Sequence, residues 1–239
     1  MAQPRILMIL TSHADLGRTG EKTGLWVEEF AAPLYAFSDA GFSPAIATIK
    51  GGAPAIDPRS IEGDAVTEAV KRYQDDKNLQ DVLAQSPKLS NVATLGYDAV
   101  FLPGGHGTMW DFPTSPELTV MLEQFALRDK PIAAVCHAPA AFAPVMDRNG
   151  APLVKGRKVS CFSDEEERAV GYEAVVPFLL ESKLRQLGAE ITPAAAFEPQ
   201  VSVDGNLITG QNPASSLATA QAMIDRLNAS AEDVEGKAA

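Results

Sequence analysis

The chain has 239 residues, 46% of them hydrophobic and 21% charged, and its formal net charge is −11. This composition predicts a soluble globular protein with a sizeable core, and the length fits one α/β domain or at most two small ones. The acidic balance, with no basic stripe to offset it, argues against nucleic acid or an anionic membrane as a partner. No apolar run is long enough to cross a bilayer, and the N-terminal residues lack a signal-peptide cleavage site.

Cysteine usage points to the same kind of protein. The sequence holds only two cysteines, Cys136 and Cys161. Two cysteines do not make a disulfide scaffold, and they fit a reducing compartment, so we expect a cytoplasmic location. A bridge between the two is conceivable but is not the expected state.

The first part of the chain predicts a parallel α/β arrangement. A continuous apolar run at 5–11 indicates a buried parallel strand. Apolar residues at 26, 27, 30, 34 and 37 form the stripe of an amphipathic helix. A second strand is expected at 42–49. Residues 51–90 have weak apolar periodicity and are interpreted as an insertion beside the sheet that carries one or two surface helices.

The rest of the chain continues the alternation of strands and helices. A Pro-flanked apolar strand is expected at 131–135, directly before Cys136. The other expected elements are a strand at 98–102, a helix at 117–128, a strand at 157–162, a helix at 173–187, a hairpin at 201–210 around Asp-Gly, a helix at 214–228 and a disordered tail at 230–239.

Cys136 lies where the strand at 131–135 gives way to an Ala-rich helix start. This is the pattern of a strand–nucleophile–helix elbow, which presents a side chain in the crevice above the carboxyl ends of parallel strands. The amino end of a helix would favour the thiolate. The alternative is a small buried cysteine inside a strand, and from this stretch alone both interpretations stay open.

A second informative turn, Gly-Gly-His-Gly at 104–107, follows the strand at 98–102. Glycines allow positive φ and close backbone approach, so N–H groups can converge there on a ligand oxygen. The turn lacks the Gly-Lys-Ser/Thr ending of a phosphate loop. Four acids at 164–167 follow another predicted strand; a solvated turn is their default interpretation, but one of them could orient a histidine.

Five segments, in this order and spacing, resemble the DJ-1/PfpI superfamily of the class I glutamine amidotransferase-like fold: RILMILTS, KTGLWVEEF, FLPGGHGTMWDFP, AAVCHAPAAF and ITGQNPASS. The resemblance covers nearly the whole chain and is strongest to the heat-shock-31-like branch. It implies one flavodoxin-like three-layer domain over 1–229, with a mostly parallel sheet, helices on both faces and the insertion. It also implies a glutathione-independent glyoxalase (glyoxalase III, D-lactate dehydratase), and a homodimer is expected.

The resemblance assigns roles residue by residue. Cys136 matches the nucleophile and His137 the histidine that follows it. Glu29 matches the acid that faces the sulfur, whereas Glu28 points outward, and Glu167 best matches the acid that orients the histidine. The oxyanion and substrate-binding positions are Gly105, His106, Ala138 and Trp26. No metal is expected, because two of the three histidines, His13, His106 and His137, already belong to the site.

These residues suggest chemistry on methylglyoxal, a small α-oxoaldehyde. The Cys136 thiolate would add to the aldehyde, and His137 or Glu29 would move a proton between the two carbons through an enediol. Hydrolysis of the resulting thioester gives lactate, and no cofactor is needed because the net oxidation state is unchanged. A partly buried Glu29 should have a raised pKa and can donate a hydrogen bond to the sulfur.

Two other classes of function remain open at this point. One is a stress-response chaperone or protein deglycase with a redox-sensitive cysteine. The other is a cysteine peptidase or amide hydrolase. The adjacent Cys136-His137 pair makes a hydrolase less natural, since neighbouring residues seldom bring ring and sulfur into triad geometry.

Overall fold

A computed structural model describes the backbone of residues 3–238 and the side chains of residues 3–229. Within this range six strands form one sheet in the order β2-β1-β3-β4-β6-β5. Neighbouring strands are parallel, except for the antiparallel β5–β6 hairpin. The strands are β1 (Arg5–Leu10), β2 (Ser43–Thr48), β3 (Ala99–Leu102), β4 (Ile132–Val135), β5 (Val201–Asp204) and β6 (Leu207–Gly210).

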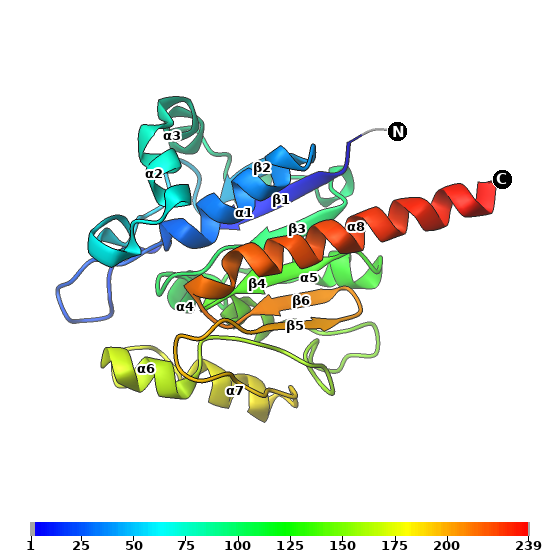
Figure 1. Ribbon diagram of the computed structural model, residues 1–239. Coiled ribbons are helices and arrows are strands. Elements are labelled where there is room, and N and C mark those ends of the chain that lie inside the picture. The colour runs from blue at the N-terminus through cyan, green and yellow to red at the C-terminus, as the bar shows by residue number, and fades with distance from the viewer. Residues whose placement is uncertain (1–2, 239) are drawn as a thin grey trace.

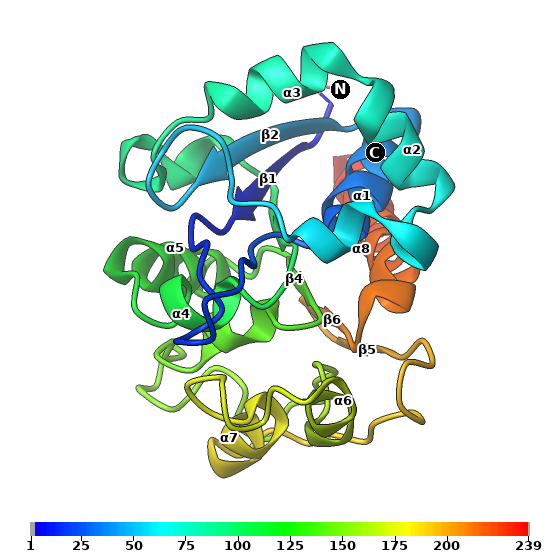
Figure 2. The same ribbon diagram turned by 90° about the vertical axis from the view of Figure 1, so that its left-hand side faces the viewer.

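Helices cover both faces of this sheet, as Figures 1 and 2 show. One face carries α1 (Val27–Asp39) packed against α8 (Ser216–Ala238), and the other carries α4 (Thr108–Asp111), α5 (Pro116–Leu127) and the 3-10 helix η5 (Ala138–Phe142). The remaining helices are α2 (Glu68–Asp75), α3 (Lys77–Ala84), α6 (Asp164–Val170) and α7 (Leu180–Gln186). The three-layer, flavodoxin-like α/β sandwich predicted from the sequence is therefore confirmed.

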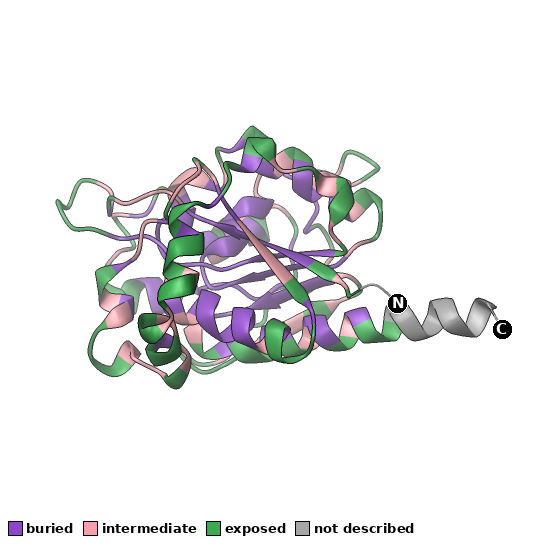
Figure 3. Cartoon of the chain, turned by 90° about the horizontal axis from the view of Figure 1, so that it is seen from above, coloured by how far each residue is buried: buried purple, intermediate pink, exposed green. Residues whose placement is uncertain are grey.

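The buried strands explain why the sequence shows continuous apolar runs instead of alternation. In β1, Ile6, Met8 and Leu10 belong to the core under α1 and α8. Leu7 and Ile9 belong to the core on the opposite face. Successive side chains of a strand point to opposite faces, so a sheet with two covered faces needs apolar residues at every position. Figure 3 shows the buried residues concentrated in the sheet and on the inner sides of the helices.

The carboxyl ends of β1, β3 and β4 lie at one edge of the sheet, because these neighbouring strands are parallel. The loops that leave them begin at Thr11, Pro103 and Cys136. Backbone bonds join these loops, for example from Trp26 N–H to the Gly104 carbonyl oxygen at 3.2 Å. The fold therefore gathers at this edge three segments that are far apart in the sequence.

Two predicted elements differ from the structure. Residues 157–162 are not a strand, because their N–H groups bond to scattered acceptors such as the Asp204 carboxylate, the Thr209 hydroxyl and the Cys136 carbonyl. A lone bridge between Lys158 and Glu190 is all that remains of strand pairing there. The helix predicted at 173–187 is only α7.

Pro177 explains why that helix is short. Proline has no N–H and disfavours the helical conformation of the residue before it, so the chain turns at 173–179 and becomes helical at Leu180. The acids at 164–167, interpreted by default as a solvated turn, instead open helix α6.

Other predictions agree with the described residues. The hairpin around Asp204-Gly205 is present, and the insertion carries the two short helices α2 and α3. Cys136 and Cys161 are both free. No helix among the described residues is long and apolar enough to span a membrane. The side chains of the tail at 230–239 lie outside the described residues, so its predicted disorder stays a prediction.

Candidate active site

Cys136 follows β4 with a φ of +60°. Few residues other than glycine adopt this conformation, and such strain is typical of functional sites. The backbone is fixed on both sides: the Cys136 N–H donates to the Gly210 oxygen at 2.9 Å, and the Cys136 oxygen accepts from Phe162 N–H at 2.8 Å. The residue is 3% exposed and lines a cavity. Cys136 is thus buried, as expected for a cysteine that packs in the core. It also lines a cavity, as predicted for a strand–nucleophile–helix elbow.

His137 lies against the thiol, with Nδ1 at 3.2 Å from Cys136 Sγ. On its other side, His137 Nε2 donates to Glu167 Oε2 at 2.8 Å. Because a carboxylate can only accept, this bond leaves the Nδ1 lone pair facing the thiol. Neighbouring residues seldom reach this contact without help, and two features supply the help here: the positive φ of Cys136 and the hydrogen bond from His137 to Glu167.

Glu167 accepts from two histidines, since its second oxygen is 2.8 Å from His106 Nε2. Burial alone would raise the pKa of Glu167, but its interactions with His137 and His106 outweigh burial and hold the pKa well below its usual range. Burial and the neighbouring His137 lower the pKa of His106 to about 4. The resting arrangement is therefore a carboxylate shared by two rings.

Helix α6 explains which of the four acids reaches the histidines. Ser163 and Glu166 form a capping box, in which each side chain accepts from the other's backbone N–H. Asp164 accepts from Ser182, and Glu165 is exposed. Glu167, the last acid of the first turn, is 2% exposed and contacts both His106 and His137. The sequence alone had left the choice among these acids open.

Glu29 lies in the first turn of α1 and is fully buried. Its Oε2 accepts from Gly104 N–H at 2.9 Å, and its Oε1 has no hydrogen-bond partner among the described residues. The carboxyl is close enough to Cys136 for each group to shift the pKa of the other. Glu28, by contrast, points away and accepts from the Thr67 hydroxyl.

Burial raises the pKa of Glu29 and of the Cys136 thiol well above their ordinary values. For Glu29 this is the expected direction. For Cys136 it corrects the expectation of a favoured thiolate, because η5 is a 3-10 helix of only five residues and offsets little of the desolvation. Burial thus favours the protonated form of both groups.

The Gly-Gly turn brings backbone donors to the sulfur. Gly105 has a φ of +101°, and a Cβ there would lie 2.2 Å from the Gly24 oxygen. Its N–H is directed at the Cys136 thiol and opposes the rise of that thiol's pKa. A Cβ at Gly104 would lie 2.5 Å from Glu29 Oε2. Both glycines are thus required for the close approach of three loops, and Gly105 can stabilise an oxyanion.

These groups surround a cavity of about 250 Å³. Of the predicted substrate-binding residues, Trp26, Gly105 and His106 line it. Ala138 does not, because η5 turns its side chain into the core. The structure adds lining residues that the sequence did not indicate as a group: Arg59, Phe162, Val170, Tyr172, Phe197 and Pro213.

The same three side chains that orient the thiol are of the types that bind metals. The ligand atoms of His106, His137 and Glu167 lie within 4.8 Å of one another. However, each Glu167 oxygen already accepts a hydrogen bond from one ring at 2.8 Å. The donor set is thus satisfied internally, and we assign these residues to thiol chemistry.

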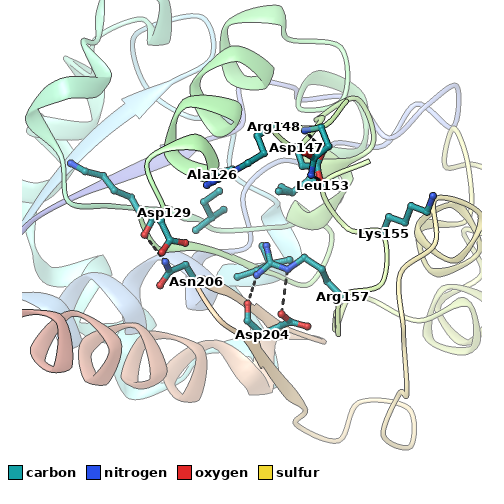
Figure 4. A pocket seen from close by; sticks show the side chains of 13 residues that line it. Ala126, Asp129, Asp147, Arg148, Leu153, Lys155, Arg157, Asp204 and Asn206 are labelled. Atoms are coloured by element: carbon teal, nitrogen blue, oxygen red, sulfur yellow. Dashed lines mark hydrogen bonds and ion pairs between the residues drawn. The ribbon is translucent and has the colours of Figure 1, made fainter. Parts of the chain in front are cut away.

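A second cavity, of about 350 Å³, lies at the opposite, amino ends of β4 and β6 (Figure 4). Charged residues such as Lys155, Arg157 and Asp204 line it, and Arg157 is bound to Asp204. Neither cysteine nor histidine is among its lining residues. The smaller cavity around Cys136 is therefore the candidate active site.

A mostly parallel α/β sheet, with a cysteine elbow after a central strand and a histidine and two carboxyl groups at the thiol, defines a class of cysteine-centred α/β proteins. Within that class, this chain belongs to the DJ-1/PfpI family, whose family model matches residues 24–226. The family resemblance noted in the sequence is thereby confirmed.

Individual proteins show similarity over nearly the full length. The glutathione-independent glyoxalase HSP31 of Saccharomyces cerevisiae is 29% identical over 236 residues, which cover 95% of this chain and 99% of that protein. The crystal structure of glyoxalase III from Candida albicans superposes with a TM-score of 0.85 at 28% identity, covering 93% and 97% of the two chains. The Rapid Encystment Protein of Francisella tularensis reaches a TM-score of 0.90 at 36% identity, covering 94% and 99%.

Proposed function

We propose that the protein is a glutathione-independent glyoxalase that converts methylglyoxal to lactate, with Cys136 as its nucleophile. The observation that carries this proposal is the thiol itself: it is in contact with His137 Nδ1 at 3.2 Å, adjoins the buried Glu29 carboxyl, whose pKa is raised by burial, and opens into a small cavity. The similarity to full-length glyoxalases supports the choice of reaction.

The first step is attack on the aldehyde carbon. His137 Nδ1 accepts the thiol proton as the sulfur bonds to carbon and then passes it to the aldehyde oxygen, which gives a hemithioacetal and restores the neutral ring. Glu167 holds the ring in the required tautomer and stabilises the imidazolium that forms. The Gly105 N–H binds the oxygen as its negative charge develops. A nucleophile that is neutral at rest thus becomes a thiolate only in contact with substrate.

The second step moves the aldehyde hydrogen to the neighbouring carbon. The neutral His137, or Glu29 once it has lost its own proton, removes the proton from the first carbon, the electrons form an enediol, and the proton returns at the second carbon. The first carbon is thereby oxidised and the second reduced, so the product is a thioester of lactate on Cys136. Water then cleaves the thioester, which releases lactate and restores the thiol.

A cysteine amide hydrolase is the second candidate. The side-chain contacts that run from Cys136 through His137 to Glu167 are those of a catalytic triad. The cavity argues for the glyoxalase. Its wall of Trp26 and several other aromatic side chains suits a small molecule better than an extended peptide.

The chaperone and redox-sensor alternative has less support. Large exposed apolar residues lie on different elements, for example Val82 on α3, Val120 on α5 and Leu217 on α8. A buried thiol with a raised pKa is also a poor target for oxidation. The cytoplasmic location and the homodimer rest on cysteine usage and on the family resemblance, and they stay predictions.

The proposal is tested by incubating the protein with methylglyoxal in the absence of glutathione and assaying D-lactate. We expect the wild type to form lactate and Cys136→Ala to lose this activity while keeping its fold. Cys161→Ala is the matched control, since Cys161 is equally buried but does not line the cavity.

Full lactate production by Cys136→Ala would refute the mechanism. Turnover of a peptide p-nitroanilide but not of methylglyoxal would favour the hydrolase instead.

A further inference from the structure

Arg59 is the one lysine or arginine among the residues that line the Cys136 cavity. It lies in the 3-10 helix η1 (Pro58–Ile61), outside the elements that carry the thiol, the histidines and Glu167. The rest of the wall is largely aromatic and aliphatic. A single positive charge in apolar surroundings interacts strongly with any negative charge that enters the cavity. None of the reaction steps proposed for Cys136, His137 and Glu29 uses it.

The guanidinium is held in place by a built network. Arg59 Nε and Nη2 donate to the two oxygens of Asp57 at 2.9 and 2.6 Å, in a bidentate pair. Asp57 is fully buried and also accepts from the Thr23 hydroxyl at 2.9 Å. Arg59 Nη1 donates to the Tyr172 hydroxyl at 2.6 Å, and Tyr172 in turn donates to Glu21 at 3.3 Å.

This network leaves part of the guanidinium available. Arginine has five N–H donors. Three of them are used by Asp57 and Tyr172, and the remaining two, on Nη1 and Nη2, have no acceptor among the described residues. The Arg59 side chain is 37% exposed, whereas Asp57 is fully buried. Asp57 therefore fixes the group and two N–H bonds stay free for a ligand.

We propose that Arg59 binds the second carbonyl oxygen of the substrate, the one that the thiol does not attack, and so selects α-dicarbonyl compounds over simple aldehydes. This inference rests on the proposed function. In the proposed reaction the first carbonyl oxygen is bound by the Gly105 N–H, which lies at the Cys136 thiol. When the aldehyde proton is removed, the electron pair moves into the carbon–carbon bond and negative charge develops on the second oxygen, where a fixed cation stabilises it. Arg59 forms no covalent bond with the substrate and transfers no proton to it.

Glyoxylate is the probe for this role. It has an aldehyde next to a carboxylate, so Cys136 can form a hemithioacetal with it, but the ketone needed for proton transfer is absent. Acetaldehyde is the comparison compound, because it has no second oxygen. Binding of either compound is measured as protection of Cys136 from iodoacetamide, followed by intact-protein mass spectrometry, and does not depend on turnover.

In Arg59→Met we expect the protection by glyoxylate to weaken on the order of 10- to 100-fold, the loss typical of a charge-assisted hydrogen bond. Protection by acetaldehyde should not change. The kcat for methylglyoxal should also fall in Arg59→Met, because the interaction between Arg59 and the second oxygen strengthens in the transition state. The matched control is Arg148→Met, an exposed arginine of the other cavity, which should behave as wild type.

Removing Arg59 leaves the buried Asp57 carboxylate without its partner, which can destabilise the fold. The double variant Asp57→Asn/Arg59→Met removes this charge as well and should repeat the selective loss of glyoxylate protection. Equal protection by glyoxylate in wild type and in the folded double variant would overturn the role of Arg59. If the wild type makes no lactate but Arg59 still controls glyoxylate protection, the proposed glyoxalase function fails and the binding role of Arg59 stands.

Discussion

Glu28 and Glu29 show how strongly one residue's direction decides its chemistry. Both are acids in the first turn of α1, where they suit the helix dipole. Successive helix residues point about 100° apart, so only one can face the sheet. Glu29 is fully buried beside Cys136, whereas Glu28 is partly exposed and contacts Thr67 of the insertion. Burial raises the pKa of both carboxyl groups, but of the two only Glu29 adjoins the Cys136 thiol.

Glu29→Gln keeps an oxygen for the Gly104 N–H but removes the ionisable carboxyl. We expect its kcat for lactate formation to fall by roughly 10²- to 10⁴-fold, the usual contribution of a general acid or base. Glu28→Gln is the matched control and should retain activity within about threefold, since surface substitutions have small effects. Steady-state kinetics on both variants decide the matter. A large loss in Glu28→Gln with an active Glu29→Gln would mean that the roles of the two acids are reversed.

At the scale of elements, the site depends on how closely two strand ends approach the start of α1. Gly104 lies between Glu29 Oε2 and the Val135 oxygen, each only 2.5 Å from where its Cβ would be. The Val135 oxygen belongs to the backbone and cannot move away easily, and Glu29 could move only by leaving its position beside Cys136. The turn after β3 is therefore a spacer that sets the distance between Glu29 and the elbow.

Gly104→Ala should displace Glu29 and lower both activity and stability, the free energy of unfolding by roughly 1–3 kcal/mol, as is typical of overpacking. Gly96→Ala is the control, because the nearest atom to a Cβ there, at 3.1 Å, belongs to the flexible Arg5 side chain. Neither glycine has a positive φ, so the comparison isolates packing. Urea unfolding and the lactate assay measure the two effects. Equal stability of the two variants would contradict the spacer role of Gly104.

Elements were predicted well where a periodic pattern was strong and poorly where long-range partners decided. The run at 5–11 and the stripe of α1 follow from the sequence alone, because burial on known faces requires them. Residues 157–162 are apolar enough for a strand, yet their N–H groups bond to side chains and to the Cys136 carbonyl. The sequence does not show which acceptors a segment will meet.

At the scale of the whole molecule, burial of a neutral histidine links the site to stability. The pKa of His106 is about 4 in the folded protein, against an ordinary value of 6.5. Between these values the unfolded chain takes up a proton that the folded protein does not. The contribution that the neutral His106 makes to the free energy of unfolding is therefore fully present above pH 6.5. It is lost as the pH drops toward 4.

We expect this loss to reach roughly 3 kcal/mol by pH 4, from the 1.36 kcal/mol that each pKa unit represents. Glu167, whose pKa is depressed, adds a loss in the same direction below its ordinary value of 4.5. In His106→Gln the decrease between pH 6.5 and 4.5 should be largely absent. Urea unfolding of the wild type and the variant across this range checks this, and an unchanged slope in His106→Gln would exclude the linkage.

For the molecule as a whole, the sequence by itself determined the α/β class, the elbow at Cys136, the Gly-Gly turn and the family. These depend on local patterns: buried runs, turn glycines and short motifs whose residues are adjacent in the chain. Only the tertiary structure decided which acid reaches His137, that burial raises the pKa of the thiol, and that Arg59 belongs to the cavity. Those features depend on distances between segments far apart in the sequence and on the exclusion of water. A single short segment, such as the turn at Cys136, specifies neither the distances nor the burial.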